Sequence, residues 1–501
     1  MRTRKFEELE RNLLEALEEK EFKIRNDKLE KVIAVFRGIA NEIKIYKLTE
    51  PFMHEYYYSQ IFNINNVIHK DGTPALVLAA KKGYTDAVKM LIAAGVDVNV
   101  KGKDGDSALT WSASNGNISS IQALLEAKAN VNNQNKWLQT PLYCAVKNSQ
   151  LNCIKELLKA RADKNIPDKD GFSPLMIAVT KNNPDCVELL LEAKADVNIS
   201  NHEGNTALTY AAGLGHIKCL NVLLKEEVDL NAQNKNGETA LFLAACNGHA
   251  LCEQALMDVK ADLNVINARG KTALIIAVAN NNESCAKLLI DAKANVNTKD
   301  KEDLTALNWA ACKGYYGLLN TLLEAKADLN IKNSKGHTAL MAAIPEGHSN
   351  CVTLLLSKNA DVDVQDNDGE TALIKSIIKR DSISVRGLLD AKADVNISDK
   401  EKWTPLHFAA YHGLDNYVEA LLDSKSDTRK ADKRGHKALW YADNYQPTRG
   451  RLRCVKLITD HDKEQNKKSG LFHLFSSHKT PVNQTVQTQE GNVKNPLRQR
   501  K

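Results

Sequence analysis

The chain has 501 residues, of which 43% are hydrophobic and 26% charged, and its formal net charge is +6. No stretch approaches the roughly 20 apolar residues of a membrane-spanning helix, so we expect no membrane span. The basic N-terminus is followed by Glu7, Glu8 and Glu10, where a secretory signal requires an apolar run. These features predict an intracellular, cytoplasmic protein.

The positive charge is concentrated at the C-terminal end. Residues 449–501 contain 12 Lys or Arg against 4 Asp or Glu, a net charge of +8, which leaves −2 for the rest of the chain. A basic tail therefore follows a body that is close to neutral. Residues 463–501 are polar except for 471–475, and their composition predicts a disordered tail.

Residues 1–62 carry helical patterns that do not repeat. Apolar residues at helical spacing run from Phe6 to Leu17 and again from Leu29 to Ile43, and a third helix is expected from Thr49 to Tyr57. Stacked-repeat proteins expose apolar surface at their ends, so we expect an N-terminal helical cap. The alternative is a small helical module that recruits a second partner.

From residue 63 to residue 462 one pattern returns every 33 residues. Glycines mark it at Gly72, Gly105, Gly171, Gly204, Gly237, Gly270, Gly336, Gly369 and Gly435. Leu138, Asp303 and Lys402 occupy the same position in the other units. Self-similarity with this period predicts a solenoid of about twelve stacked units.

Each unit encodes two helices and a hairpin. In the fifth unit, Thr206 is suited to cap the first helix and Gly215 to end it in the left-handed conformation. The apolar residues of the second stretch, from Cys219 to Leu224, share one helical face. Asp229 to Asn231 then leads into an Asn- and Gly-rich turn that favours a hairpin tip.

The pattern resembles the ankyrin repeat. The match is carried by Thr404 to Ala410, which reads TPLHFAA, together with Gly413 and the Leu421–Leu422 pair. The resemblance implies an all-α repeat solenoid of helix-turn-helix units joined by β-hairpins. It also implies a non-enzymatic scaffold that binds a partner protein on a concave face made of hairpin tips and first helices, and we expect a monomer.

Six of the ten cysteines are spaced by multiples of 33 residues: Cys153, Cys186, Cys219, Cys252, Cys285 and Cys351. Equivalent positions in stacked repeats lie about 10 Å apart, which exceeds the roughly 7 Å Cα separation that a disulfide allows. They fall on the apolar face of the second helix, where cysteine acts as a small hydrophobic residue. We therefore interpret them as buried packing residues.

Basic residues stand where the ankyrin pattern has a glycine after the second helix: Lys128, Arg161, Lys194, Lys260, Lys293, Lys326, Lys392 and Lys425. If these positions are left-handed, each non-glycine residue costs about 1 kcal/mol. Acidic residues lie two positions before several of them, so a locally neutralised, solvated edge is favoured over an acidic-partner site.

The ninth and tenth units depart from the pattern. Pro345 disfavours helix at Ile344, Arg380 replaces a turn glycine, and Gly387 lies inside a second helix. We expect local opening near residues 340–390.

No catalytic, cofactor or metal motif is recognisable in the sequence, so we expect no enzyme. His407 and His412 are close in sequence, but His407 matches a structural ankyrin position that bonds within the turn.

The resemblance places partner-binding residues at the hairpin tips and at the ends of the first helices. On that basis we predict Trp137, Phe172, His337, Trp403, Tyr411 and His412. The alternative for these aromatic residues is packing against the next hairpin. Trp111, Tyr210, Trp309 and Tyr441 occupy a more interior helix position and are expected in the core.

Composition adds one further expectation. Repeats rich in Lys, Asn and Ile resemble ankyrin proteins that intracellular bacteria deliver into the host cytosol, and a protist or viral origin fits the composition nearly as well. The alternative is an adaptor whose basic tail contacts nucleic acid or an anionic membrane, although we do not expect the solenoid to bind nucleic acid.

Overall fold

The computed structural model describes residues 2–19, 26–28, 30–32, 34, 72–445 and 448–468. The chain divides into two compact units, residues 1–360 and 361–501, which are described separately. Most of the helix expected at 29–43, the helix expected at 49–57 and the tail beyond residue 468 lie outside the described residues.

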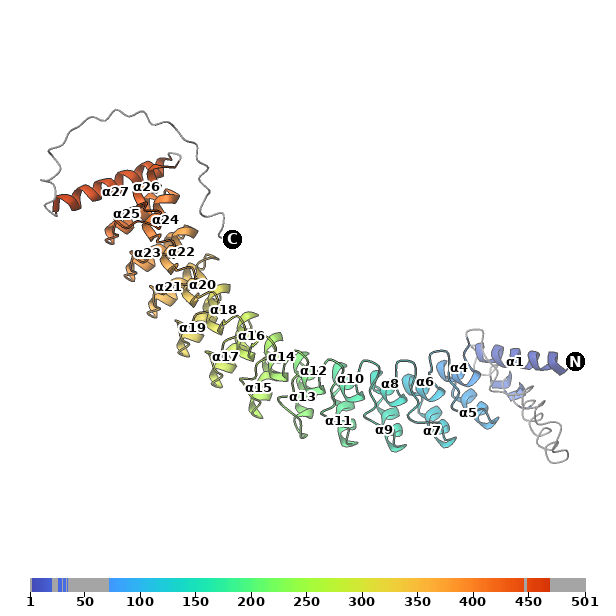
Figure 1. Cartoon of the computed structure of the whole chain (residues 1–501). Coiled ribbons are helices and arrows are strands. Elements are labelled where there is room, and N and C mark those ends of the chain that lie inside the picture. The colour runs from blue at the N-terminus through green and yellow to red at the C-terminus, as the bar shows by residue number, and fades with distance from the viewer. Residues whose placement is uncertain are drawn as a thin grey trace. The chain divides into compact units, whose positions relative to one another are not determined.

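The first unit contains α1 (Arg2–Glu18) and nine helix pairs stacked in two layers (Figure 1). The first helices of the pairs are α4 (Ala75–Lys81), α6 (Ala108–Asn115), α8 (Pro141–Lys147), α10 (Pro174–Thr180), α12 (Ala207–Gly213), α14 (Ala240–Asn247), α16 (Ala273–Ala279), α18 (Ala306–Lys313) and α20 (Ala339–Ala343). The second helices are α5 (Thr85–Ala93), α7 (Ile118–Glu126), α9 (Leu151–Lys159), α11 (Pro184–Glu192), α13 (Ile217–Leu223), α15 (Ala250–Asp258), α17 (Glu283–Asp291), α19 (Tyr316–Glu324) and α21 (Ser349–Ser357).

The second unit contains three more pairs. Its first helices are α22 (Ala372–Lys379), α24 (Pro405–His412) and α26 (Ala438–Asp443). Its second helices are α23 (Ser382–Asp390), α25 (Asp415–Asp423) and α27 (Arg449–Lys468). The predicted all-α repeat architecture is confirmed, and the described residues hold isolated antiparallel bridges, such as Ser200 with Thr206, in place of strands.

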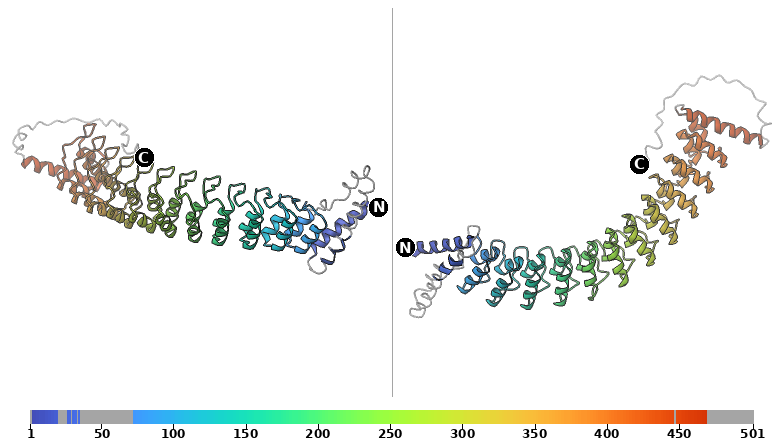
Figure 2. Two further views of the ribbon diagram at one scale, coloured as in Figure 1. Left: turned by 90° about the horizontal axis from the view of Figure 1, so that it is seen from below. Right: turned by 180° about the vertical axis from the view of Figure 1, so that it is seen from behind.

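Most first helices begin at a hydroxyl cap. The Thr206 side chain accepts a hydrogen bond from the Thr209 N–H, which satisfies one of the free donors at the start of α12. As predicted, Gly215 adopts a positive φ of 72° after the helix. Because the same capping and helix-ending residues recur in successive repeats, the first helices have nearly equal lengths. The hairpins between pairs project to one side of the first unit (Figure 2).

From the third repeat onward, each hairpin tip is closed by an Asn or Asp three residues before the position of the repeat glycine. In the sixth repeat the Asn234 Oδ1 accepts hydrogen bonds from the N–H groups of Asn236 and Glu238, each at 2.9 Å. Gly237 has a φ of 73°, and a Cβ there would lie 2.8 Å from the Ala268 nitrogen of the next hairpin. Leu138 keeps a φ of 59° at this position, so the backbone conformation persists without glycine.

Asparagines at the end of each repeat bind the next repeat. The Asn132 Oδ1 accepts the Asp163 N–H at 2.8 Å, and the Asn165 Oδ1 accepts the Asp196 N–H at 3.0 Å. Equivalent bonds recur with a spacing of 31 residues at Asn198, Asn231, Asn264, Asn297, Asp363 and Asn396. Successive repeats are therefore joined by the same pair of atoms, in addition to apolar packing.

The core is the apolar seam between neighbouring helix pairs. The six periodic cysteines lie in it, all with at most 1% of their surface exposed, and all ten cysteines of the chain are free thiols. Burial raises the pKa of Cys153, Cys186 and Cys219 to about 11. The interpretation of this ladder as packing residues is confirmed.

The eight basic residues after the second helices are left-handed, with φ between 60° and 68°. All eight are exposed, so their long side chains remain in solvent. Each of the eight positions is therefore left-handed without being glycine, so each carries the conformational strain of about 1 kcal/mol expected for such a residue.

The irregular repeats keep the fold with local adjustments. α20 ends at Ala343, before Pro345, and Arg380 ends α22 with a φ of 58°. The division between the two compact units falls inside the 340–390 segment. Local opening of that segment stays a prediction.

The two ends differ from the inner repeats. α1 packs against α4 and buries Leu9, Leu13 and Leu17, and the role of residues 1–62 as a cap stays a prediction. At the other end, α27 continues to Lys468, so residues 463–468, which we assigned to a disordered tail, are helical. The boundary moves because α27 serves as the second helix of the last repeat and extends beyond it, with Thr428 donating a hydrogen bond to Asp462.

Candidate functional site

The most regular accessible feature is the fourth residue of the first helices. In α12, residues Ala207 to Thr209 and Ala211 to Ala212 are buried, whereas Tyr210 between them is partly exposed. The same holds in five other repeats of the first unit. We call this set the inner row: Trp111, Ile177, Tyr210, Leu243, Ile276 and Trp309. Six large apolar side chains thus recur at one position of the repeat without being buried.

Three helices of the first unit depart from this exposure pattern at the same position, and one of them, α20, carries the small Ala342 there, which is 9% exposed. Cys144 in α8 is 7% exposed and Leu78 in α4 is 4% exposed. The inner row is therefore continuous from α10 to α18, with Trp111 one repeat apart from it. Its helices form the layer on the inner side of the bend of the first unit (Figure 1).

Polar atoms of the rings are anchored to the hairpins. The Tyr210 hydroxyl accepts a hydrogen bond from the Asn201 Nδ2 at 2.9 Å, and the Trp309 Nε1 donates to the Asp300 Oδ2 at 3.0 Å. Asn201 also closes its own hairpin tip by accepting two backbone N–H groups through Oδ1. The orientation of these rings is therefore fixed by the turn that precedes their helix.

Lysines from the preceding repeats lie over the tryptophan rings of the inner row. The Lys81 Nζ is 5.2 Å from the Trp111 ring centroid, and the Lys271 Nζ is 4.2 Å from that of Trp309. Such cation–π contacts contribute about 0.5–1 kcal/mol at exposed sites. They leave the positive charges beside the apolar row.

The structure keeps three predicted tip residues of the first unit at the surface. Trp137, Phe172 and His337 are partly exposed. The Phe172 ring lies 5.2 Å from that of Tyr210, and the Lys136 Nζ lies 4.4 Å from the Trp137 centroid. Phe172 thus extends the inner row toward the hairpins, and its role in binding stays a prediction, as do those of Trp137 and His337.

In the second unit the expected exposure is wrong for two residues. Trp403 is 6% exposed and Tyr411 is 8% exposed. The Trp403 ring lies 4.4 Å from Tyr441, 5.1 Å from Phe408 and 5.5 Å from Tyr411. Aromatic residues at the row position of the eleventh and twelfth repeats fill the space around Trp403, so the alternative of packing applies.

The two histidines of α24 take different positions. His407 is 1% exposed, its Nδ1 lies 2.8 Å from the Thr404 Oγ1, and burial lowers its pKa, which favours the neutral ring. The structural role predicted for His407 is confirmed. His412 is partly exposed, and burial together with Arg380 and Arg451 lowers its pKa. Binding by His412 stays a prediction.

The prediction that Trp111, Tyr210, Trp309 and Tyr441 belong to the core is correct only for Tyr441, which is 2% exposed. The other three belong to the inner row. The sequence signal for this surface was a large apolar residue that recurs at the fourth position of the first helices. Small residues that the same helices bury lie next to it. The resemblance directed attention to the helix ends and away from this position.

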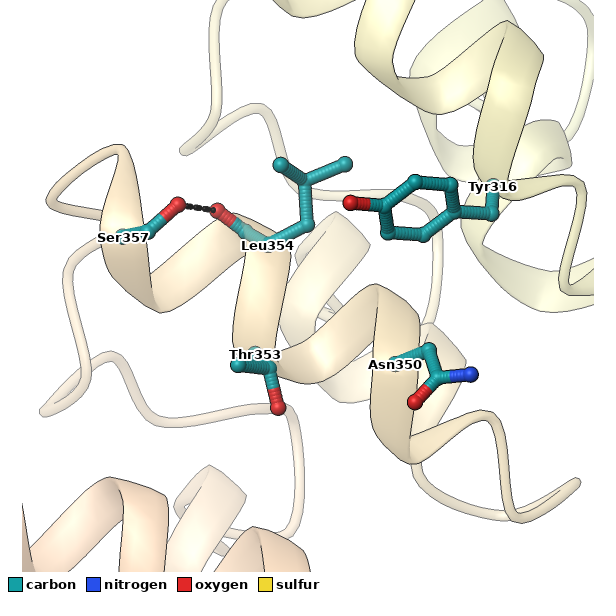
Figure 3. Close-up of a pocket in the computed structure, with 5 residues that line it drawn as sticks. All are labelled: Tyr316, Asn350, Thr353, Leu354 and Ser357. Atoms are coloured by element: carbon teal, nitrogen blue, oxygen red, sulfur yellow. Dashed lines mark hydrogen bonds between the residues drawn. The ribbon is translucent and has the colours of Figure 1, made fainter.

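A hollow lies in the layer of the second helices, between α19 and α21 (Figure 3). Its lining residues are Tyr316, Asn350, Thr353, Leu354 and Ser357. The hollow is open, Tyr316 is 51% exposed, and the Ser357 hydroxyl already donates to the Leu354 carbonyl oxygen. No charged group lines it, so it offers little to orient a ligand.

Two general features bear on chemistry. Among the described residues, no three His, Cys, Asp or Glu side chains are grouped so that they could hold a metal ion. Within the same residues, no helix combines the length and the apolar character that crossing a bilayer requires.

Comparisons with known proteins agree with the repeat architecture. A family model described as ankyrin repeats (3 copies) matches residues 46–135, 121–201, 193–267, 250–333, 307–399 and 381–469. Among solved structures, the crystal structure of the ankyrin repeat domain of Bcl-3, a unique member of the IkappaB protein family, is similar to this chain. The two sequences are 32% identical, and the match covers 41% of this chain and 94% of the other, with a TM-score of 0.39. No curated protein matches.

Ankyrin repeats are generally protein–protein interaction modules, and the family typically provides non-enzymatic scaffolds. The matched segments together run from residue 46 to residue 469, well over half of the 501 residues. The chain belongs to the ankyrin-repeat family.

Proposed function

We propose that the protein is a non-enzymatic scaffold that binds a partner protein on the inner row of its first unit. The observation that carries this proposal is the exposure pattern of the first helices. Six repeats leave one large apolar side chain accessible while burying the residues on either side of it. Large aromatic side chains in such places are typical energetic centres of protein interfaces.

The inner row is well suited to binding because its rings are already ordered. Tyr210 and Trp309 are hydrogen-bonded to hairpin residues, and Trp111 lies under Lys81. A partner that covers them loses little side-chain entropy, since rotamers that are fixed beforehand need no further ordering. Phe172 adds a fourth ring beside Tyr210.

The test uses the full chain as bait in a eukaryotic lysate. We compare the wild type with a triple variant, Trp111→Ala, Tyr210→Ala and Trp309→Ala, and identify the proteins whose capture the substitutions abolish. We expect the affinity for the partner to fall more than about tenfold, because truncation of an interface centre costs roughly 2 kcal/mol or more.

The matched control is a double variant in the other layer, Leu251→Ala and Tyr316→Ala, which removes side chains that are 73% and 51% exposed. Both variants should retain the wild-type helical circular dichroism and unfolding midpoint. Capture that survives the triple variant, or that is lost equally in the control, would contradict binding on the inner row.

The finer role also belongs to this proposal. Delivery into a host cell as a bacterial effector is supported by composition alone, and a translocation reporter fused to the full chain tests it. The adaptor alternative is supported by the net charge of +8 in residues 449–501. Because Lys and Arg release counterions when they bind a polyanion, binding through these residues should fall steeply with salt. It should also weaken markedly when residues 469–501, which carry +4 of this charge, are deleted.

A further inference from the structure

One edge of the inner row, formed by the ends of the first helices, carries lysines and no acidic residue of its own. Four first helices have a lysine at their C-terminal end, which we call the lysine edge: Lys81, Lys147 and Lys313 are last residues, and Lys181 is the C-cap of α10. All four side chains are exposed. The equivalent residues of the other repeats between α4 and α18 are uncharged: Ser114 and Asn115, Gly213 and Leu214, Cys246 and Asn247, and Ala279 and Asn280. No Asp or Glu occurs at these helix ends in eight successive repeats.

The lysine edge borders the inner row directly. The Lys81 Nζ lies over the Trp111 ring of the following repeat. The Asn115 Nδ2 donates to the Lys81 carbonyl oxygen at 3.1 Å, and the Asn148 Nδ2 donates to the Ser114 Oγ at 3.0 Å. The edge is therefore held in register by amide side chains, which bring no negative charge to it.

Within the part of the chain that the structure describes, no ion pair involves a residue of the lysine edge. Lys81 lies close enough to the hairpin carboxylates of Asp104 and Asp106 to interact with them electrostatically, whereas the charges of Lys147, Lys181 and Lys313 are balanced chiefly by solvent. Charges in this state attract a complementary ligand over about one Debye length, roughly 8 Å at physiological salt.

The dipole of the first helices does not explain the missing carboxylates. Helix C-termini favour cations over anions. Yet the second helices of the same repeats end at Glu126, Glu192, Asp291 and Glu324, with left-handed lysines two residues later. Acidic residues are therefore tolerated at one set of C-termini and absent from the set that borders the inner row.

The opposite border of the inner row, formed by the hairpins, is mixed in sign. Lys136 pairs there with Asp104, and Glu238 accepts a hydrogen bond from the Asn234 amide. Asp170 and Glu203 occupy neighbouring tips. A ligand on the inner row thus meets charges of both signs on the hairpin side and lysines without ion pairs on the helix-end side.

We infer that the inner row receives a linear protein segment in which apolar anchors alternate with carboxylates directed at the lysine edge. This inference rests on the proposed function and adds the chemistry of the partner to it. Complementary charge of this kind chiefly sets association rate and specificity, while the buried rings supply most of the affinity. A segment with lysines in place of the carboxylates would meet like charges along the same border.

The experiment selects ligands without assuming a partner. A displayed library of random peptides of about 16 residues, long enough in extended form to cross four repeats at about 10 Å each, is panned against the full-length protein. The selected peptides are then measured against the triple variant of the inner row. We call a peptide row-dependent if it binds the wild type and loses affinity for the triple variant. We expect such peptides to be enriched in apolar residues and in Asp or Glu.

Charge reversal sharpens the test. The double variant Lys147→Glu and Lys181→Glu should weaken row-dependent peptides about tenfold at low salt, with the difference shrinking as salt is added. The matched control is Lys128→Glu with Lys194→Glu, which reverses two exposed lysines at the ends of second helices. It should change affinity less than about twofold, because those lysines stand beside Glu126 and Glu192.

The outcomes separate the two claims. Row-dependent peptides without acidic enrichment, or an equal response to both charge reversals, would overturn the acidic-segment inference and leave binding on the inner row intact. Failure to recover any peptide that depends on Trp111, Tyr210 and Trp309 would overturn both. Loss of folding in the charge-reversed proteins is detected by circular dichroism, and Lys147→Gln with Lys181→Gln then replaces them, with a weaker loss of about threefold expected.

Discussion

In the first unit the fourth residue of most first helices is partly exposed, whereas Phe408 and Tyr441 at the same position of the second unit are buried. The difference arises from the number of rings around the position: Phe172 alone lies beside Tyr210, whereas Tyr441 lies in a cluster with Trp403, Tyr411 and Tyr445. The residue that follows the repeat glycine position contributes to this cluster. Trp403 stands there in the eleventh repeat and packs against both rings. One position of the repeat can therefore supply either an interface or a core, depending on the hairpin beside it.

The largest effect should come from removing the residue that makes this difference. Trp403→Ala deletes a 6% exposed ring from the aromatic cluster and should destabilise the second unit by about 3–5 kcal/mol. Trp137→Ala, the matched control in a hairpin of the first unit, should cost less than about 1 kcal/mol because its ring is partly exposed. Urea denaturation with hydrogen exchange of residues 361–445 measures both, and similar small losses would show that the cluster is not a core.

A second comparison concerns two buried ionisable side chains. In the second unit, burial would lower the pKa of Lys375, but Asp366 at 2.6 Å and Glu370 at 3.0 Å raise it, so the amine stays charged. In the first unit, Glu253 is fully buried in α15, and neither carboxylate oxygen has a hydrogen-bond partner. Burial raises the pKa of Glu253 to about 7, and the Cys285 thiol of α17 opposes the rise.

This contrast predicts a pH-dependent first unit. The unfolded carboxyl titrates near 4.5 and the folded one near 7, so the folded state binds the extra proton between these values. Stability is fully present below about pH 4.5 and falls by about 3 kcal/mol as pH rises through 7. Glu253→Leu matches Leu220 and Leu319 at the same position of other repeats, and it should flatten this decline and stabilise the first unit at pH 8.

Urea denaturation from pH 5 to pH 8 measures the slope. Glu283→Gln, which neutralises an exposed acid on the adjacent α17, is the control and should leave the decline unchanged. A Glu253→Leu protein with the wild-type pH profile would show that another group is responsible.

The smallest effect concerns the position of the repeat glycine at the hairpin tip, where both units contain left-handed residues other than glycine. Leu138 in the first unit and Lys402 in the second have φ values of 59° and 63° where most repeats have glycine. Substitution by glycine relieves about 1 kcal/mol of strain but adds unfolded-state entropy, so each change should stabilise by only about 0.5 kcal/mol. Chemical denaturation checks this, and Gly237→Ala, which would approach the Ala268 nitrogen, should destabilise instead.

The sequence predicts the repeat fold well because the fold depends on local signals that recur. Capping by Thr206, the left-handed Gly215 and the buried cysteine ladder all follow from one repeat and apply to its neighbours. Exposure is harder to predict, because it depends on which side chain of the adjacent hairpin covers a position. The Trp403 ring lies 4.4 Å from Tyr441 in a cluster that also contains Tyr411 and Tyr445, whereas Phe172 lies 5.2 Å from Tyr210 and leaves it partly exposed. A single repeat does not contain this information.

The asparagine bonds between repeats have a consequence for how such a protein can change in size. Most junctions use an oxygen of one Asn side chain, or of Asp363 in one case, and one backbone N–H of the next repeat, as between Asn132 and Asp163. Excision or duplication of a whole 33-residue module therefore leaves each donor opposite an equivalent acceptor, whereas loss of a single residue would not. The length of the binding surface is thus open to genetic recombination in discrete steps, without redesign of the joints.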